Sequence, residues 1–270
     1  VKVKYAEREG YSFCYLSRGE PGTQPSVLML HGFSFNKDMW LNTIKHFPRG
    51  IHLVCLDMPG HGETTRLLAE TYTAADQAKM IHQFVERTGL SRKPFHLVGI
   101  STGGMVAGVY AALYPSDVCA LSLLCPPGLL YPPENEFIKY LRKLRDSANS
   151  HENPFVLLSL CSGKMMTETT LTFSFIGKGF LDLSSMTSRY SLRDNMNKIR
   201  APIQVIWGKD DKVMDPSGAA LLAKAIPSTQ VQLLDKCGHF ITLDRPKKSA
   251  KLLLEFYKSN CATAKPKKLS

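Results

Sequence analysis

A Gly-x-Ser-x-Gly pentapeptide constrains this chain more than any other feature. The sequence Gly-Ile-Ser-Thr-Gly at 99–103 directly follows the apolar run Phe-His-Leu-Val at 95–98, and a stretch rich in alanine and glycine comes next. This order predicts a strand, a sharp strained turn and a helix, with the hydroxyl of Ser101 projecting above the end of a sheet. The alternative is a glycine-rich turn with a purely structural role. The strand and helix patterns on either side favour a nucleophile.

Short aliphatic runs alternate with amphipathic segments along most of the chain. The runs that predict buried strands lie at 27–30, 51–56, 95–98, 121–124, 203–207 and 231–234. The segments that predict helices lie at 73–87, 104–114, 216–225 and 246–257. Apolar strands separated by helices predict an α/β fold with a mostly parallel, doubly wound sheet. Such sheets place their sites at the carboxyl ends of strands, where Ser101 falls.

The alternation stops between residues 126 and 200, where the sequence is bounded by prolines and rich in large apolar side chains. A stretch of this length between two core strands is too long for a simple connecting loop. It fits a packed helical lobe and equally a lid that lines an acyl-chain pocket, and the two interpretations are compatible. We therefore expect a core formed by residues 1–125 and 201–270, with a helical lid at 126–200 inserted before the last two strands.

A catalytic serine needs an imidazole to accept its proton and a carboxylate to orient that imidazole. Two histidines follow Ser101 in the sequence. His151 falls in a polar part of the irregular region, whereas His239 comes one short turn after the last predicted strand. We therefore predict that His239 is the base.

Three aspartates compete for the role of the acid, because all of them follow the predicted strand at 203–207. Asp210 suits a turn in which the side chain binds its own backbone. Asp215, just before a proline, suits the N-cap of the next helix. Asp211 is the remaining candidate, and the choice among the three depends on the family spacing described below.

The tetrahedral oxyanion of acyl transfer needs backbone N–H groups that already point at it. One is expected from Thr102, the residue after the nucleophile. The other is expected from Phe33, in the loop that follows the strand at 27–30, where Gly32 allows a close backbone approach. His31 in that loop is predicted to hold the loop by side-chain hydrogen bonds rather than to act as a base.

Charge, cysteine content and the start of the chain add further expectations. The net charge is +11, from 34 basic and 23 acidic residues, and the basic residues do not gather into a motif typical of nucleic-acid binding. An anionic membrane surface and an unspecific basic surface explain this charge equally well.

The seven scattered cysteines lack the spacing of a disulfide framework or a zinc site, which favours free thiols in a reducing, cytosol-facing environment. No apolar run is long enough for a membrane span. The chain begins at Val1, so a preceding N-terminal piece is expected.

Five motifs together resemble the α/β-hydrolase superfamily over essentially the whole chain. They are His-Gly-Phe at 31–33, Asp-Met-Pro-Gly-His-Gly at 57–62, Gly-Ile-Ser-Thr-Gly-Gly at 99–104, Trp-Gly-Lys-Asp-Asp at 207–211 and Cys-Gly-His at 237–239. Longer phrases, among them those at 93–99, 108–112 and 114–118, are similar to the membrane-anchored monoacylglycerol lipases of this superfamily.

The resemblance implies that Ser101 is the nucleophile, Asp211 the acid and His239 the base, because the spacing from Asp211 to His239 suits the family pattern best. Asp57 and His61, in the second motif, are expected to be structural. Thr102 stands where this family usually carries methionine.

The resemblance also implies an activity: hydrolysis of monoacylglycerols to glycerol and a fatty acid, through an acyl-enzyme on Ser101. It implies no metal, no organic cofactor, and a membrane-anchored domain that faces the cytosol. Residues 126–200 are shorter than in the family and 162–179 match it poorly, so acyl-chain preference does not carry over. Other carboxylesterases, lysophospholipases, carbon–carbon hydrolases and a non-catalytic ligand-binding protein of the same fold remain as alternatives.

Overall fold

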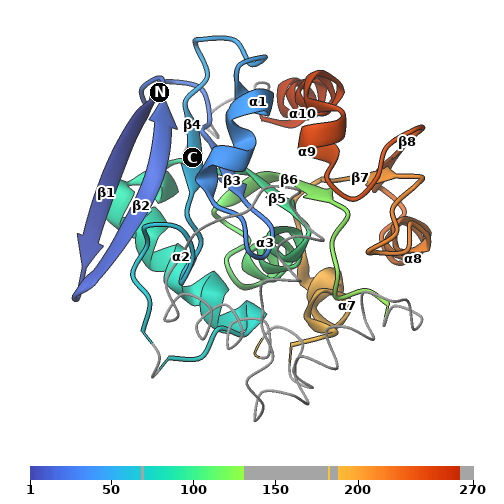
Figure 1. Ribbon diagram of the computed structural model, residues 1–270, viewed down its shortest axis with the longest axis horizontal. Helices are drawn as coiled ribbons and strands as arrows, with labels where there is room; N and C mark the ends of the chain where they lie inside the picture. The colour runs from blue at the N-terminus through green and yellow to red at the C-terminus, as the bar shows by residue number, and fades with distance from the viewer. Residues whose placement is uncertain (68–69, 131–181, 183–187, 262–270) are drawn as a thin grey trace, which may run out of the picture.

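A single mixed sheet forms the centre of the computed structural model, which describes residues 1–67, 70–130, 182 and 188–261 (Figure 1). In this part of the chain the strand order is β1-β2-β4-β3-β5-β6-β7-β8. The strands are β1 (Lys2–Arg8), β2 (Tyr11–Arg18), β3 (Val27–Leu30), β4 (Leu53–Leu56), β5 (Phe95–Ile100), β6 (Val118–Leu124), β7 (Ile203–Gly208) and β8 (Gln230–Leu234). β1 pairs antiparallel with β2 and β2 antiparallel with β4, and all the other pairs are parallel. The predicted α/β sheet is confirmed.

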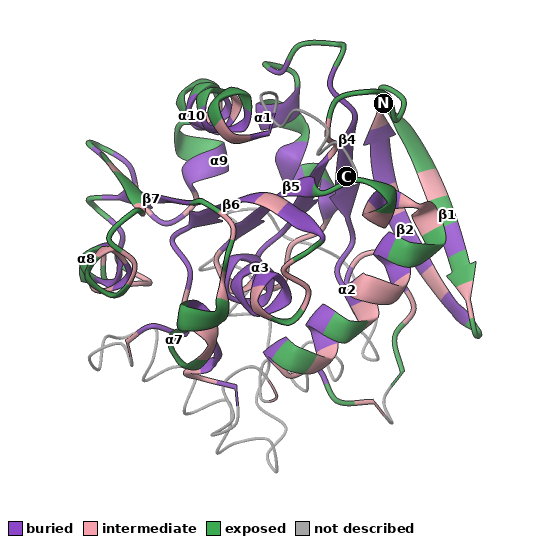
Figure 2. Cartoon of the chain, turned by 180° about the vertical axis from the view of Figure 1, so that it is seen from behind, coloured by how far each residue is buried: buried purple, intermediate pink, exposed green. Residues whose placement is uncertain are grey.

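Helices cover both faces of the sheet. The α-helices among the described residues are α1 (Leu41–Ile44), α2 (Ala74–Thr88), α3 (Thr102–Leu113), α7 (Ser191–Asn195), α8 (Ser217–Ala225), α9 (Ile241–Asp244) and α10 (Pro246–Asn260). Short 3-10 helices occur at η1 (Lys37–Trp40), η2 (Leu90–Arg92) and η3 (Met196–Lys198). α1 and α10 lie on one face, and α2, α3 and α7 on the other (Figures 1 and 2). Because both faces are covered, β3, β4 and β5 are buried along their whole length.

The two ends of the sheet differ from the sequence-based expectation. The hairpin of β1 and β2 was not predicted, because Ala6 is the one buried residue of β1 and the strand carries no apolar run. The prediction of a buried strand at 231–234 was wrong about burial. β8 is the edge strand, and Val231 and Leu233 are 37% and 46% exposed. A strand with a neighbour on one side only is less covered than its apolar sequence suggests.

The expectation that all the cysteines are free thiols was wrong for one pair. Cys119 in β6 and Cys261 just after α10 form a disulfide across 142 residues of sequence. The scattered spacing hid this pair, because α10 runs back along the sheet and only the tertiary fold brings its end to β6. Four other cysteines, Cys14, Cys55, Cys125 and Cys237, are free and buried.

Most of the predicted lid at 126–200 lies outside the described residues, and so does His151. The described part of it includes α7, which packs against α3 on the lower face in Figure 1. The division into core and lid therefore stays a prediction. Among the described residues, no helix combines the length and the apolar character that crossing a membrane requires.

Candidate active site

Ser101 occupies the sharp turn that the pentapeptide predicted. It lies between β5 and α3 with φ 53° and ψ −129°, a conformation that is strained for a residue with a side chain. Its backbone N–H donates to the carbonyl of Leu124 at 2.8 Å, which ties the turn to the end of β6. A Cβ atom on Gly103 would lie 2.2 Å from the carbonyl oxygen of His31, so this position excludes every larger residue. The glycines of the motif therefore serve the close packing of three backbone segments.

His239 lies within hydrogen-bond distance of both Ser101 and Asp211. Its Nε2 is 2.9 Å from the Ser101 Oγ, and its Nδ1 is 2.8 Å from the Asp211 Oδ2. A carboxylate can only accept, so Nδ1 carries the ring proton and donates it to Asp211. Nε2 is then free to accept the proton of the serine hydroxyl, which is the tautomer that a general base requires.

Asp211 is held by four donors. Its Oδ1 accepts from the backbone N–H groups of Val213 and Met214 at 2.8 and 2.9 Å. Its Oδ2 accepts from the indole Nε1–H of Trp207 at 3.1 Å, besides the bond from His239. The Asp211 side chain is fully buried, so these contacts replace water and leave the carboxylate one orientation.

The other two candidate aspartates do not reach the imidazole in this way. Asp210 is exposed, and its backbone N–H donates to the carbonyl of Cys237. Asp215 is exposed as well and accepts from the N–H of Ser217 at 2.8 Å. The N-cap of α8 is Pro216, so Asp215 lies one residue before the N-cap position predicted for it. Both lie in the strand-to-helix connection that contains Asp211, and of the three only Asp211 meets His239.

The predicted oxyanion donors lie on the two segments that meet at Ser101. Thr102 is the first residue of α3, where N–H groups lack an intrahelical partner and the helix dipole favours negative charge. Phe33 belongs to the segment after β3, and a Cβ on Gly32 would lie 3.2 Å from the Ser101 Cβ. This close approach agrees with the predicted arrangement, and the role of the two N–H groups stays a prediction.

His31, Asp57 and His61 form a supporting layer behind these segments. The His31 Nδ1–H donates to the carbonyl of Gly32 at 2.7 Å, and its Nε2 accepts from the N–H of Met58 at 2.9 Å. Burial, with a smaller contribution from His61, holds the pKa of His31 well below its usual value. Burial likewise lowers the pKa of His61 to about 4. Both rings are neutral near pH 7, and their structural role, predicted from the turn motifs, is confirmed for His31 by its two bonds.

Two further residues near the site, Cys125 and Lys37, were not predicted from the sequence. Cys125 belongs to none of the five motifs, yet its thiol donates to the carbonyl of His239 at 3.1 Å. Its burial, followed by the charge of Asp211, raises the pKa of this thiol well above its usual value, so it stays protonated as a donor. Cys125 directly follows β6, and the neighbouring strand β5 ends just before Ser101, so its place in the sequence could have indicated a position near the site. Lys37, described below, lies in no recognisable motif.

Two clusters in the described part of the chain bring metal-ligand atoms within 4.8 Å of one another. One is Cys125 with Asp211 and His239, and the other is Cys14 with Asp57 and Glu63. In the first cluster the carboxylate and imidazole bind each other, and the thiol is protonated. In the second the carboxylates already bind a lysine ammonium. These donor sets suit hydrogen bonding, and the expectation of a reaction without a metal or cofactor stays a prediction.

Known proteins resemble this chain over nearly its full length. The family model described as alpha/beta hydrolase fold matches residues 25–151 and 177–246. Monoacylglycerol lipase ABHD6 from Rattus norvegicus is 49% identical, over 96% of this chain and 83% of its own. ABHD6 from Bos taurus is 48% identical, over 100% of this chain and 86% of its own.

Solved structures agree on the fold. A bacterial membrane phospholipase A superposes with a TM-score of 0.80 at 24% identity, covering 96% of this chain and 86% of its own. The serine hydrolase CarC of carbazole degradation superposes with a TM-score of 0.76 at 21% identity, covering 96% of this chain and 99% of its own. With the serine turn, the buried Asp211–His239 pair and these matches together, the chain belongs to the α/β-hydrolase fold family and is a relative of the monoacylglycerol lipases ABHD6.

Proposed function

We propose that this protein is a serine hydrolase that cleaves monoacylglycerols to a fatty acid and glycerol. The observation that carries the proposal is the hydrogen-bonded chain from Ser101 through His239 to Asp211, with distances of 2.9 and 2.8 Å. The substrate class rests on the ABHD6 relatives, which are monoacylglycerol lipases.

Acylation begins when the Ser101 Oγ attacks the ester carbonyl carbon while His239 Nε2 takes the hydroxyl proton. The resulting oxyanion is stabilised by the N–H groups of Thr102 and Phe33. When the tetrahedral intermediate collapses, the imidazolium returns its proton to the departing glycerol oxygen, and the acyl group remains on Ser101. Asp211 keeps the ring oriented and stabilises its positive charge throughout this step.

Deacylation repeats the same steps with water. His239 takes a proton from a water molecule, the hydroxide attacks the acyl carbonyl, and the proton then passes to the Ser101 Oγ as the fatty acid leaves. Each group is used twice, so removing any of the three affects both halves of the cycle.

Glycerol release from 2-acylglycerols of several chain lengths tests the proposal. Ser101→Ala should lower turnover by roughly a thousandfold or more. Ser217→Ala, at an exposed serine at the start of α8, is the matched control and should keep the wild-type rate. Turnover by Ser101→Ala at the control rate would rule out this mechanism.

The same assay with other substrates distinguishes this function from another ester hydrolase, a carbon–carbon hydrolase and a binding protein. If lysophospholipids or short carboxylic esters are cleaved and acylglycerols are not, the chain is another carboxylic ester hydrolase. Cleavage of a vinylogous diketone alone would mean carbon–carbon hydrolysis. Folded protein that turns over none of these substrates and resists a fluorophosphonate probe would be a binding protein.

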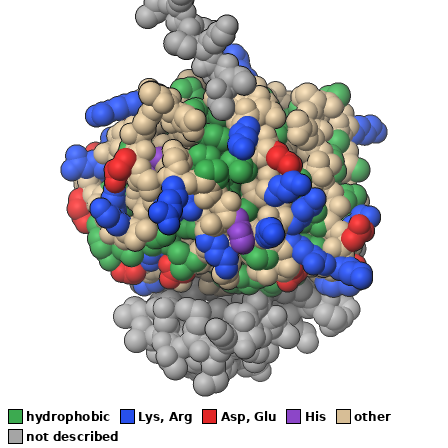
Figure 3. Space-filling view, turned by 90° about the horizontal axis from the view of Figure 1, so that it is seen from above, with side chains coloured by type: hydrophobic (Ala, Val, Ile, Leu, Met, Phe, Trp, Pro, Cys, Tyr) green, Lys and Arg blue, Asp and Glu red, His purple; other side chains and the backbone are tan. Residues whose placement is uncertain are grey.

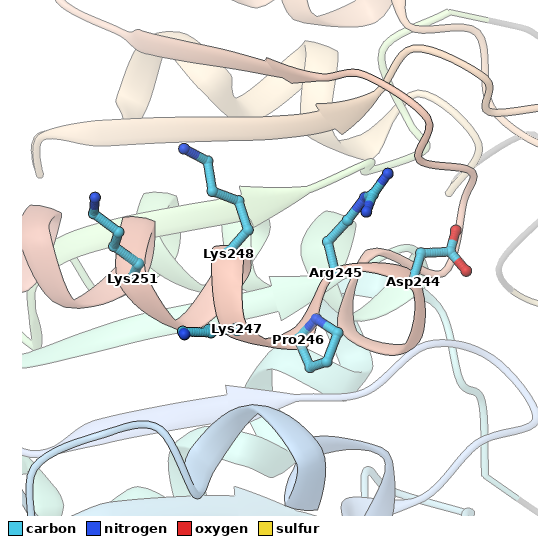
Figure 4. Close-up of a pocket in the computed structure, with 6 residues that line it drawn as sticks. All are labelled: Asp244, Arg245, Pro246, Lys247, Lys248 and Lys251. Atoms are coloured by element: carbon cyan, nitrogen blue, oxygen red, sulfur yellow. The ribbon is translucent and has the colours of Figure 1, made fainter.

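We also propose that the protein works at a cytosol-facing membrane surface and binds no nucleic acid. The cytosol-facing orientation rests on the family resemblance alone, because the Cys119–Cys261 disulfide removes the argument from free thiols. Its net charge is +11, and Lys and Arg side chains are widespread on the face formed by α1 and α10 (Figure 3). A surface hollow of about 410 Å³ beside α9 and α10 is lined by Asp244, Arg245, Pro246, Lys247, Lys248 and Lys251. Arg245, Lys248 and Lys251 project from the same side of this segment (Figure 4). Such a surface attracts anionic lipid headgroups.

Sedimentation with vesicles tests this second proposal. Binding to vesicles that contain phosphatidylserine should exceed binding to phosphatidylcholine vesicles. Reversal of two exposed charges, Lys247→Glu with Lys248→Glu, should weaken it at least about tenfold, since each basic residue contributes about 1 kcal/mol. Lys224→Glu, on the exposed side of α8, reverses one charge instead of two, so it controls for half of the change in net charge and should weaken binding less. Equal binding to the two kinds of vesicle would contradict the proposal.

A further inference from the structure

A buried ion-pair cluster lies beside the segment that carries Phe33. The Lys37 side chain is 5% exposed, and its Nζ lies 3.0 Å from the Asp57 Oδ2 and 3.0 Å from the Glu63 Oε1. The Asp57 side chain is fully buried. Glu63 is the exposed member of the cluster, with a side chain 57% exposed, and its Oε2 accepts from the hydroxyl of Tyr5 at 2.6 Å. Lys37, in the connection after β3, therefore binds two carboxylates of the connection after β4, and Glu63 links this cluster to Tyr5 in β1.

Asp57 holds Lys37 twice. The Lys37 backbone N–H donates to the Asp57 Oδ1 at 2.7 Å, in addition to the bond from Nζ to Oδ2. The same carboxylate also accepts from the N–H of Glu63 at 2.9 Å. Asp57 thus fixes the backbone at the start of η1 and the connection after β4 in a single arrangement.

The segment from His31 to Lys37 is anchored at both ends to the connection after β4. At its start, His31 binds the N–H of Met58, and at its end Lys37 binds Asp57. Between the two anchors, the Phe35 N–H donates to the Gly32 carbonyl at 3.2 Å and closes a turn. Phe33 lies inside this turn, so the position of its N–H depends on both anchors.

Stability alone does not explain a lysine at this place. Taking an ammonium out of water costs free energy that its carboxylate partners only partly return, and an apolar replacement is often as stable. A buried, charge-assisted set of hydrogen bonds does restrict geometry more than apolar contacts do. Oxyanion donors need that restriction, because an error of about 1 Å in position can cost about a hundredfold in rate.

We propose that Lys37 is a positioning residue of the active site: its bonds to Asp57 and Glu63 set the geometry of the segment that presents the Phe33 N–H to the oxyanion. This inference rests on the proposed serine-hydrolase function. Lys37 itself touches neither substrate nor the reacting atoms. Its effect appears in transition-state stabilisation and not in the binding of the ground state.

The test compares Lys37→Met with Lys45→Met, an exposed lysine of the next turn whose Nζ meets only Asn42 among the described residues, at 3.1 Å. Active sites are counted by burst titration with a fluorophosphonate, and kcat is expressed per titrated site. Lys37→Met should lower kcat about tenfold to a hundredfold with KM changed less than about twofold. A trifluoromethyl ketone, which forms a tetrahedral oxyanion on serine, should lose affinity by the same factor as kcat. Lys45→Met should match the wild type in all three measurements.

Lys37→Gln keeps an N–H donor toward Asp57, so it provides a second test if Lys37→Met does not fold. Its kcat should fall between those of the wild type and Lys37→Met. A purely structural role would lower the number of titratable sites or the melting temperature and leave kcat per site unchanged, and that result would overturn the inference. A wild type that releases no glycerol would contradict the proposed function. An active wild type with equally active Lys37 variants would refute the role of Lys37 and leave the proposed function standing.

Discussion

Ser101 and its two predicted catalytic partners, Asp211 and His239, are held in place by different kinds of contact. Ser101 sits in a turn fixed by backbone crowding, where Gly103 packs directly on the carbonyl of His31. Asp211 and His239 lie in two connections that follow β7 and β8, and side-chain hydrogen bonds hold them. The turn can be recognised in a short stretch of sequence because its constraint is local. The acid–base pair depends on the order of strands in the sheet.

This difference predicts that the acid–base pair tolerates substitution structurally but not chemically. Asp211→Asn keeps the shape of the side chain and an acceptor for Val213 and Met214. It faces His239 with an amide that can no longer favour the correct tautomer, so kcat should fall about 10⁴-fold while the protein stays folded. Steady-state kinetics and a melting curve measure the two effects. Asp210→Asn, the exposed neighbour, is the control, and a similar loss there would contradict the assignment of the acid.

The nucleophile turn should behave in the opposite way. Gly103→Ala forces a Cβ into the backbone of His31, so we expect a loss of stability of about 3 kcal/mol or more, with activity falling in parallel. Gly50→Ala adds a Cβ with no heavy atom within 4 Å and should be nearly neutral. Thermal unfolding of both variants checks this. Full stability of Gly103→Ala would show that the turn is less crowded than the structure indicates.

A smaller effect is expected where one side-chain bond is removed from the acid. Trp207→Phe keeps an aromatic ring in the core but loses the N–H that donates to Asp211 at 3.1 Å and to the carbonyl of Met214 at 3.1 Å. We expect kcat to fall about tenfold, in line with the loss of a hydrogen bond to a charged group. Trp40→Phe is a matched control, because its buried Nε1 has no hydrogen-bond partner among the described residues. Equal kcat values for the two variants would mean that the indole does not help to hold Asp211.

The smallest effect concerns stability in acid, away from the site. Burial lowers the pKa of His96 to about 3, while the unfolded chain titrates near 6.5. Between these values the unfolded state binds the proton and the folded state does not. Stability is therefore fully present above about pH 6.5 and is lost as the pH falls toward 3. His61 adds to this loss between about 6.5 and 4.

His96→Leu removes one of these groups. The free energy of unfolding should then depend less on pH between 6 and 4, by about 1.4 kcal/mol per pH unit. Urea unfolding at several pH values measures the slope, and His46→Leu, at an exposed histidine, controls for the change of residue type. An unchanged slope in His96→Leu would mean that His96 is protonated in the folded protein.

The strands at 27–30, 95–98 and 203–207 could be predicted because each is buried along its length and is apolar apart from His96 and Gln204. The outer strands could not be judged in the same way. β1 has a mostly polar sequence, and in β8 the apolar side chains of Val231 and Leu233 are exposed, because the covering of an edge strand depends on its neighbours.

By itself the sequence determined the family and the serine turn and, through the family spacing, predicted the roles of Asp211 and His239, because these rest on local backbone geometry and on motifs whose order the fold preserves. Only the tertiary structure decided which side chains support them. Lys37 meets Asp57, Cys125 meets the His239 backbone, and Cys119 meets Cys261 through contacts between segments far apart in the chain. Such contacts leave no periodicity or motif in the sequence, since they arise where separate elements pack together.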